Sequence, residues 1–548
     1  MLHPFCLLSW QNDGRSWQSG SASEATFRRR GDEFVDRCET DNGQSRSPGR
    51  AVLPTGKMTD PLRGWLVPLV VALGAYGVAI AGAHALLNDG DTLSHIAIGR
   101  WIIAHHALPF RDPFSFTAHG EAWVPHEWLA EVVFALIYDR LGWGGIVTLT
   151  ALAGAAAFGI LTHALARTLG LRRSVLAALA GFSLVEAHYL ARPHALAWPC
   201  LVVWMAGVVG ACDRGRLPSL ALLPVMTLWC NLHGGFVVGL LFAALLAVEA
   251  VWQAPSAARF CALQGWGVFL AFAGLAALVS PNGVDGLLLP FKMLRMNFAL
   301  SSISEWRATN FARFDPIEVW IGLLILGGCT LGLRVPVSRM LMVLLLLWMA
   351  LNHVRNEELL GVIAPLLVAA PLAMQLKPLT LLRQVPVPGA ASRLFRQPRI
   401  MRAVGEIAGL TVLMGITVFA TVRLLNHSGL APRAEVAPVE ALTAARRAGL
   451  DGHVFNSVRF GGYLMFEGIP TFVDGRADLF GDAFLKRYVA AMNALGSHLP
   501  GLLDRYAIRW TLLEPQSPAA DLLDHLPGWE RLYADDHAVV YRRKPPRS

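Results

Sequence analysis

Charged residues are scarce in this chain. They make up 16% of its 548 residues, whereas hydrophobic residues make up 54%, and the mean hydropathy is positive. In a typical soluble domain about a quarter of the residues are charged. The composition therefore excludes a soluble globular protein of this length and indicates a polytopic membrane protein.

Several functional signatures are also missing. The sequence has no P-loop, no dinucleotide-binding fingerprint, no cysteine and histidine spacing typical of a metal site, and no nucleophile elbow. Seven cysteines are present, but most lie in or beside apolar segments, which argues against a disulfide framework and favours packing roles. These are Cys200, Cys212, Cys230, Cys261 and Cys329.

The N-terminal segment lacks the pattern of a cleavable signal peptide, because FCLLSW is too short for an apolar core and no small-residue cleavage site follows it. Residues 1–57 are polar and without sustained periodicity, so they predict disorder. Two origins fit this segment: a cytoplasmic tail, or an over-extended start ahead of Met58. The first apolar run then serves as an uncleaved targeting signal.

Apolar runs long enough to cross about 30 Å of hydrocarbon recur along the chain up to about Leu425. We expect about eleven helical spans. They are 65–87, 144–166, 174–190, 194–211, 217–232, 234–252, 264–280, 317–333, 340–351, 359–376 and 405–425.

Basic residues indicate how these spans are oriented. If the helices alternate, most arginines fall in connections on one side, which the positive-inside rule makes the cytoplasm. The net charge of +8 then reflects orientation and does not indicate nucleic-acid binding. The anchoring arginines include Arg167, Arg172, Arg173, Arg214, Arg216, Arg259, Arg334 and Arg339. The outer side receives 88–143, 188–194, 231–233, 281–316, 352–358 and everything after Asn426.

The most informative motif is DGDTLSHIAIGRW, residues 89–101, which follows the first span directly. It places two carboxylates, a histidine and an arginine where the chain leaves the membrane: Asp89, Asp91, His95 and Arg100. Other polar residues gather at the outer span ends, namely His126, Glu127, Arg192, His194, His233, Glu305 and Arg355. Ionisable groups at membrane depth are costly, so converging ones are functional candidates.

Each of these residues also has a purely structural interpretation. Asp91 would cap a helix from Thr92 to about His106 by accepting a bond from the Ser94 N–H. His194 would bond a neighbouring carbonyl, and Arg192 would extend to phospholipid headgroups. The tryptophans Trp123, Trp128 and Trp306 would be interfacial anchors. None of these interpretations explains why the polar groups share one side of the membrane.

A large first external loop covers residues 107–143. LPFRDPFSFTAHGEAW contains prolines and a glycine that predict an irregular crossing. VPHEWLAEVVFALIYDRLG predicts an amphipathic helix opened by Pro125, with Glu127 and Glu131 on one face and apolar residues on the other. Such a helix lies in the membrane interface and would help to roof a cavity between the spans.

Residues 431–548 predict a small α/β domain outside the membrane. VEALTAARRAG is helical, and HVFNS, TFVDG, RWTLLE and AVVYRR are short strand-like runs. Asp474, Arg476 and Asp478 fall in a turn after a strand. In a functional interpretation they bind an acceptor or cover the cavity, while turn chemistry with an internal salt bridge is the favoured interpretation.

These motifs together resemble the C-type superfamily of integral membrane glycosyltransferases, in its bacterial members related to protein O-mannosyltransferases and lipid-A-modifying transferases. The resemblance rests on Asp89 and Asp91 after the first span, HIAIGRWIIAHH, PFRDPFSF and WVPHEWLAE. It also rests on RPH at 192–194, NLHGGF at 231–236, SPNG at 280–283 and SEW at 304–306. It covers about residues 60–425, with a weaker likeness at NSVRFGGYL and VDGRADLFG in the C-terminal part.

The resemblance implies a polyprenyl-phosphate-linked sugar as donor, with the first acidic residue of the first loop as catalytic base. It leaves open whether Asp89 or Asp91 holds that position, and members of the superfamily differ in whether they need a metal. The implied partners are a membrane lipid and a glycan or protein acceptor. The implied location is the bacterial inner membrane, with the site on its extracytoplasmic side.

The chemistry of sugar transfer agrees with these residue types. An acceptor hydroxyl has a high pKa, so a carboxylate is needed to take its proton, and Asp91 is our first choice with Asp89 second. Cations would stabilise the leaving phosphate. The candidates for substrate binding are His95, Arg100, His126, Glu127, Arg192, His194, His233, Glu305 and Arg355. A divalent cation held by Asp89 and Asp91 is compatible with oxygen ligands, and the sequence does not decide it.

Two other classes of function stay open. A transporter of lipid-linked glycans predicts internal repeats and broken helices, which the sequence does not display. A noncatalytic envelope assembly protein explains an extracytoplasmic domain but not the acidic first loop. The predicted fold is thus mostly α: a polytopic transmembrane bundle (58–430) with a large first external loop, and a small C-terminal α/β domain (431–548).

Overall fold

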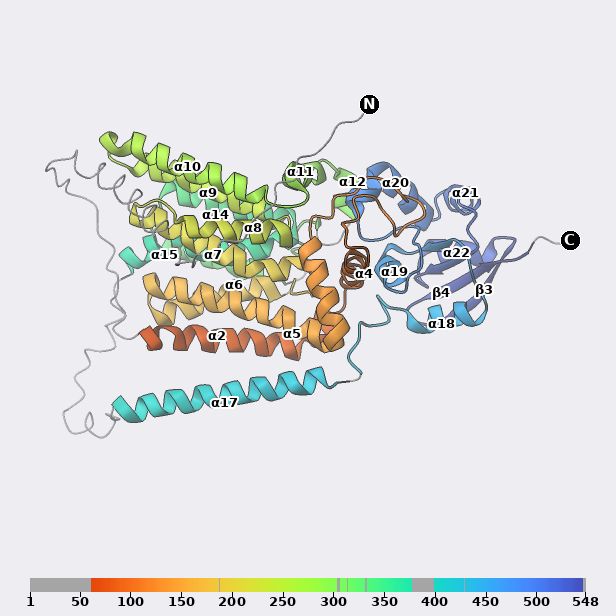
Figure 1. Cartoon of the computed structure of the whole chain (residues 1–548), viewed down its shortest axis with the longest axis horizontal. Coiled ribbons are helices and arrows are strands. Elements are labelled where there is room, and N and C mark those ends of the chain that lie inside the picture. The colour runs from red at the N-terminus through yellow and green to blue at the C-terminus, as the bar shows by residue number, and fades with distance from the viewer. Residues whose placement is uncertain are drawn as a thin grey trace, which may run out of the picture.

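The computed structural model describes residues 61–545, apart from 187, 303–305, 313, 331–332, 377–398 and 428. The predicted tail at 1–57 lies outside these residues. A bundle of long helices occupies one side of the molecule, and a small sheet with its own helices sits at one end of the bundle (Figure 1). This arrangement confirms the predicted fold class, a helical membrane bundle followed by a small α/β part.

Each of the eleven predicted spans overlaps a helix. These helices are α2 (Pro61–Ala81), α5 (Trp128–Leu169), α6 (Leu171–Glu186), α7 (Pro193–Arg214), α8 (Leu223–Leu232), α9 (Phe236–Gln253), α10 (Arg259–Ala277), α13 (Pro316–Thr330), α14 (Val337–Asn352), α15 (Glu357–Gln375) and α17 (Arg399–Leu425). By length and composition, seven helical segments of the described chain can cross a membrane, and shorter apolar helices accompany them. The protein is therefore a multi-pass membrane protein.

The connecting helices gather near the ends of the spans. They are α3 (Ala83–Leu86), α4 (Gly90–His105), η1 (Leu220–Leu222), η2 (Ser256–Ala258), α11 (Gly283–Met293), α12 (Asn297–Ser302) and η4 (Val354–Asn356). α4 carries the DGDTLSHIAIGRW motif and lies between the bundle and the C-terminal part (Figure 1).

Helix α5 joins the predicted interfacial helix to the second predicted span. The two halves meet at Gly142, whose backbone is left-handed (φ 60°, ψ −155°), a conformation that glycine adopts at little cost. The first half lies across the end of the bundle (Figure 1). Its acidic face turns inward, since Glu131 is buried while Leu136 on the other face is exposed.

One predicted anchoring arginine has a different role. Arg339 lies in the first turn of α14 and is 2% exposed. Its Nη2 lies 2.7 Å from Asp213 Oδ1, and its Nε donates to Glu249 Oε1 at 2.8 Å. The anchoring prediction for Arg339 is wrong, because the residue points among α7, α9 and α15 and ties these helices together.

The C-terminal part contains α18 (Val439–Arg447), β1 (Val454–Asn456), α19 (Val458–Phe466), α20 (Ala477–Met492), α21 (His498–Arg505), β2 (Trp510–Leu513), α22 (Pro518–His525), β3 (Trp529–Ala534) and β4 (Val539–Arg543). The strand order is β1-β2-β4-β3. β1 and β2 are parallel, and the other neighbours are antiparallel. The predicted helix VEALTAARRAG corresponds to α18.

The predicted strand TFVDG is not part of this sheet. Thr471 forms an isolated bridge with Ser115 of the first external loop instead, and Thr117 Oγ1 donates to the Phe472 carbonyl at 2.6 Å. Only Thr471 of this segment pairs as a strand residue does, and its partner lies far away in the sequence. The strand β3 was missed, since most of its side chains are not fully buried and it lacks an apolar run.

Helix α4 packs into the core of the C-terminal part. Leu93 is fully buried in a cluster with Phe460, Tyr463 and Leu464 of α19. Tight backbone contact accompanies this packing, because a methyl group on Gly462 would overlap the carbonyl oxygen of Gly90. The motif after the first span and the C-terminal part are thus one packed unit.

Candidate active site

Asp89 and Asp91 share one guanidinium at the start of α4. Arg192 precedes α7, and its Nη2 donates to Asp89 Oδ1 at 2.8 Å and lies 3.1 Å from Asp91 Oδ2. A second bond runs from Arg192 Nε to Asp89 Oδ2. Arg192 therefore binds the two predicted catalytic carboxylates, and the interpretation of Arg192 as a headgroup anchor is wrong.

The two carboxylates differ in environment. Helix α4 begins at Gly90, and Asp89 is its N-cap, accepting a bond from Asp91 N at 3.2 Å. The prediction that Asp91 caps a helix starting at Thr92 is wrong, because the helix begins two residues earlier. The Asp89 side chain is 9% exposed and that of Asp91 is 33% exposed. Asp91 is therefore the more accessible acid.

The guanidinium of Arg192 also decides the charge of Asp89. Burial alone would raise the pKa of Asp89, but the charge of Arg192 and its hydrogen bonds outweigh burial and hold the pKa below its usual value. This arrangement favours the ionised form of Asp89, with its charge compensated by Arg192.

His95 lies one turn beyond Asp91 and contacts two glutamates. Its Nδ1 is 3.3 Å from Glu131 Oε1 and its Nε2 is 3.8 Å from Glu127 Oε2. Burial lowers the pKa of His95, yet the bond with Glu131 and the nearby carboxylates, including Asp91, prevail and raise it. The arrangement favours a protonated imidazolium beside Asp91.

Glu127 is surrounded by imidazoles. Besides His95, His126 Nε2 lies 3.8 Å and His233 Nε2 3.6 Å from Glu127 Oε1. Burial alone would raise the pKa of Glu127. The charges of these rings and of Arg355 outweigh burial, so the pKa of Glu127 lies below its usual value. Burial is also the main reason that the pKa of His233 falls to about 4. Predicted residues from three separate segments therefore meet at one carboxylate.

One asparagine of the NLHGGF motif and one of the SPNG motif hold the segment around Glu127 in place. Trp128 Nε1 donates to Asn231 Oδ1 at 2.8 Å, and Asn282 Nδ2 donates to the Pro125 carbonyl at 3.0 Å. Both bonds fix the start of α5 against the bundle, so Glu127 stays beside His233.

His194 and Arg355 lie on the bundle side of the cluster. The His194 and His233 rings are 6.1 Å apart, and His194 Nε2 is 3.3 Å from the His188 carbonyl, the neighbouring-carbonyl contact of the structural interpretation. The Arg355 guanidinium lies 4.9 Å from the centre of the Trp306 ring. The charge of Arg355 contributes to the lowered pKa values of Glu127 and His233. Arg355 therefore belongs to the same cluster.

Sequence reasoning missed two acids at the start of α15. Glu358 Oε2 accepts a bond from Trp198 Nε1 at 3.0 Å and lies 3.9 Å from His194 Nε2. Glu357 Oε2 lies 3.9 Å from His188 Nε2. An adjacent acidic pair at the edge of the tenth predicted span was the available signal.

Arg100 is not brought into this cluster. It pairs with Asp139, with Nη2 to Oδ1 at 2.6 Å, and its guanidinium lies over the Tyr138 and Phe466 rings. Nine positions separate Arg100 from Asp91, which is about two and a half helical turns and places the two on opposite faces of α4. Glu305 lies outside the described residues.

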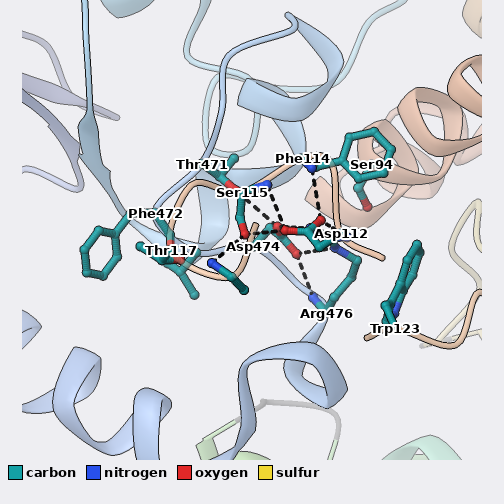
Figure 2. Close-up of polar contacts among 12 residues, drawn as sticks. Ser94, Asp112, Phe114, Ser115, Thr117, Trp123, Thr471, Phe472, Asp474 and Arg476 are labelled. Carbon is teal, nitrogen blue, oxygen red and sulfur yellow. Dashed lines mark hydrogen bonds and ion pairs between the residues drawn. The ribbon is translucent and has the colours of Figure 1, made fainter. Parts of the chain in front are cut away.

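A buried ion cluster joins the first external loop to the C-terminal part (Figure 2). Arg476 Nη2 donates to Asp474 Oδ2 at 2.7 Å, and Arg476 Nη1 donates to Asp112 Oδ1 at 2.8 Å. The favoured interpretation of this turn, an internal salt bridge, matches the pair Asp474 and Arg476. Asp112, in PFRDPFSF, was missed because its partner is 364 positions away.

Asp478 also faces the first loop. Trp123 Nε1 donates to Asp478 Oδ2 at 3.1 Å, and burial is the main reason that the pKa of Asp478 is raised. Trp123, predicted as an interfacial anchor, thus contacts the C-terminal part, and its ring lies 4.8 Å from the Arg476 guanidinium.

Metal binding was left open by the sequence. Among the described residues, no three His, Cys, Asp or Glu side chains are grouped to hold a metal ion. Arg192 sits between the two predicted ligands, Asp89 and Asp91, in the place that a bridging cation would take.

No protein-family model and no curated protein matches this chain. Among solved structures, ArnT from Cupriavidus metallidurans bound to undecaprenyl phosphate is similar with a TM-score of 0.47 and 17% identity, over 87% of this chain and 98% of ArnT. The apo state of the same protein has a TM-score of 0.47 and 16% identity, over 88% of this chain and 98% of ArnT. The Archaeoglobus fulgidus oligosaccharyltransferase has a TM-score of 0.46 and 9% identity, over 83% of this chain and 70% of the oligosaccharyltransferase chain.

Proposed function

We propose that this protein is an integral membrane glycosyltransferase that moves a sugar from a polyprenyl-phosphate donor to a lipid, glycan or protein acceptor. The observation that carries the proposal is an accessible carboxylate, Asp91, held beside Arg192 at the end of a transmembrane bundle. His95, whose charge interacts with Asp91, leads from there to Glu127, around which further imidazoles and Arg355 gather. Base and cations are thus placed where a lipid-linked sugar phosphate would meet its acceptor.

In the proposed reaction the acceptor oxygen attacks the anomeric carbon of the donor sugar. The bond from that carbon to the phosphate oxygen breaks, and its electron pair leaves with the polyprenyl phosphate. Asp91 takes the proton of the acceptor hydroxyl as the new bond forms. Arg192, Arg355 and protonated His95 stabilise the negative charge that grows on the phosphate.

Asp91 is a better base than Asp89 in this arrangement. Asp89 caps α4 and accepts two bonds from Arg192, which keeps its oxygens occupied. Asp91 has a third of its side chain exposed. A polyprenyl phosphate, such as the undecaprenyl phosphate in the ArnT crystal structure, would bring its phosphate between Asp91 and the cationic groups.

A chromosomal deletion tests the proposed activity most directly. The glycolipids and glycoproteins of the deletion strain should lack one sugar modification that its parent carries, as measured by mass spectrometry. Wild-type protein supplied from a plasmid should restore the modification, whereas the Asp91→Asn variant at equal abundance should not. Identical glycan profiles in parent and deletion strain would contradict the proposal.

We also propose that the site and the residues after Asn426 lie outside the cytoplasm of a bacterial inner-membrane protein. The support is the arginine distribution: Arg167, Arg172, Arg214 and Arg259 lie at or beyond the opposite ends of the helices from α4. Residues 58–430 would then form the membrane domain and 431–548 the extracytoplasmic domain.

A fusion after Ser548 tests this orientation. Alkaline phosphatase, which is active only outside the cytoplasm, should be active there, and a fluorescent protein that folds only in the cytoplasm should stay dark. The same reporters placed after Arg216, in a predicted cytoplasmic connection, serve as the inverted control. A fluorescent, phosphatase-negative Ser548 fusion would place the domain on the other side.

A further inference from the structure

Gly475 lies directly against the carboxylate of Asp91. A methyl group on Gly475 would overlap Asp91 Oδ1 and come within 3.0 Å of its Cγ and 3.3 Å of its Oδ2. The three nearest atoms to that position all belong to Asp91. Gly475 itself is exposed, so its small size is not needed to fill a core.

Backbone conformation does not explain the glycine either. Gly475 is not among the glycines with a left-handed φ, so an alanine could adopt its backbone without strain. The nearest obstacle to a side chain at this position is Asp91. The contact therefore links the VDGRADLFG segment to the carboxylate that we propose as the base.

Both neighbours of Gly475 are fixed. Asp474 and Arg476 are buried in the ion cluster with Asp112, and Arg476 lies between the rings of Phe114 and Trp123. A substituent on Gly475 cannot be relieved by a shift of the segment without breaking this cluster. The carboxylate of Asp91 is the end of a flexible side chain, so it is the part that would have to shift, and the shift would disturb its ion pair with Arg192.

We infer that Gly475 is a positioning residue, whose bare backbone holds the Asp91 carboxylate in the direction in which it accepts the proton of the acceptor hydroxyl. The inference rests on the proposed glycosyltransferase function. It gives the C-terminal part a role in catalysis, because the segment that closes over α4 sets the geometry of the base. A displacement of about 1 Å in a reacting group can cost about a hundredfold in rate.

The test compares Gly475→Ala with Gly501→Ala in the purified full-length protein. Gly501 lies in α21, and a methyl group there would meet open space. With a synthetic polyprenyl-phosphate sugar, Gly475→Ala should lower kcat by about 10- to 100-fold while KM for the donor stays near wild type. Gly501→Ala should leave both parameters unchanged. In the Asp91→Asn background, Gly475→Ala should cause no further loss.

A second measurement follows the contact without activity. Gly475→Ala should lower the thermal unfolding temperature relative to wild type, and adding Asp91→Ala should restore it to that of Asp91→Ala alone, because the obstacle is gone. If Gly475→Ala does not fold, recovery in the double variant supports the contact, and failure to recover overturns it.

The two possible failures are distinguishable. Equal kcat for Gly475→Ala and Gly501→Ala beside an active wild type would overturn the positioning role alone. No turnover by the wild type, with glycans unchanged in the deletion strain, would overturn the proposed function and the positioning role with it.

Discussion

Replacing Asp91 by asparagine is expected to slow sugar transfer by about 10² to 10⁴, the contribution of a positioned general base. Asparagine keeps the size of the side chain but cannot take the acceptor proton. Helix α4 should remain intact, because Asp89 and not Asp91 provides its N-cap. The measurement is initial turnover of donor lipid by the purified variant, with the thermal unfolding temperature as a check that the fold is kept.

Asp89→Asn is the matched comparison. Asparagine is a good N-cap, but it removes the charge that pairs with Arg192, so this variant should lose stability and a smaller share of its turnover. Near-normal transfer by Asp91→Asn together with an inactive Asp89→Asn would move the base to Asp89. Full activity of both variants would exclude the mechanism.

Arg476→Ala is expected to destabilise the protein by about 3 to 5 kcal/mol, the usual cost of removing one partner from a buried ion pair. Asp112 and Asp474 would stay buried without a counter-charge, on the two sides of the contact between the first loop and the C-terminal part. The measurement is the apparent free energy of unfolding in detergent. Limited proteolysis should cut the C-terminal part of the variant more readily.

A second substitution separates charge from packing in this variant. If buried charge causes the loss, removing one of the two carboxylate charges relieves it, so Arg476→Ala combined with Asp474→Asn should be more stable than Arg476→Ala alone. Arg476→Met, which keeps an apolar side chain beside Trp123, should be rescued in the same way. A loss of stability that Asp474→Asn does not relieve would assign the effect to packing.

Hydropathy predicted the membrane part of the fold because that signal is local. A helix that crosses lipid must be apolar over its whole length, and all eleven predicted spans overlap helices. The polar residues at the outer ends were also found, since His95, Glu127 and His233 stood at predicted span ends and do meet. The prediction that Arg100 joins this cluster is wrong. Arg100 is close to Asp91 in sequence, but the helical periodicity of α4 places the two residues on opposite faces.

What the sequence could not predict depends on long-range pairing. Whether Asp89 or Asp91 caps α4 turns on a shift of two residues, which lies within the uncertainty of any helix boundary. TFVDG has the composition of a strand, but its partner is the loop around Ser115. The contact of Gly475 with Asp91 had no local signal at all, because a glycine in a turn usually reflects backbone conformation.

The packing of α4 into the C-terminal part also determines the order in which the site can form during synthesis. Asp112 leaves the ribosome 364 residues before its partner Arg476, a delay of about 20 to 70 s at ordinary rates of synthesis. During that time the spans insert, while Leu93 has none of the α19 side chains that later bury it. A nascent or prematurely terminated chain thus carries the residues proposed to bind donor lipid but lacks Gly475, the C-terminal neighbour of Asp91. The proposed site is therefore complete only after the C-terminal part has been translated.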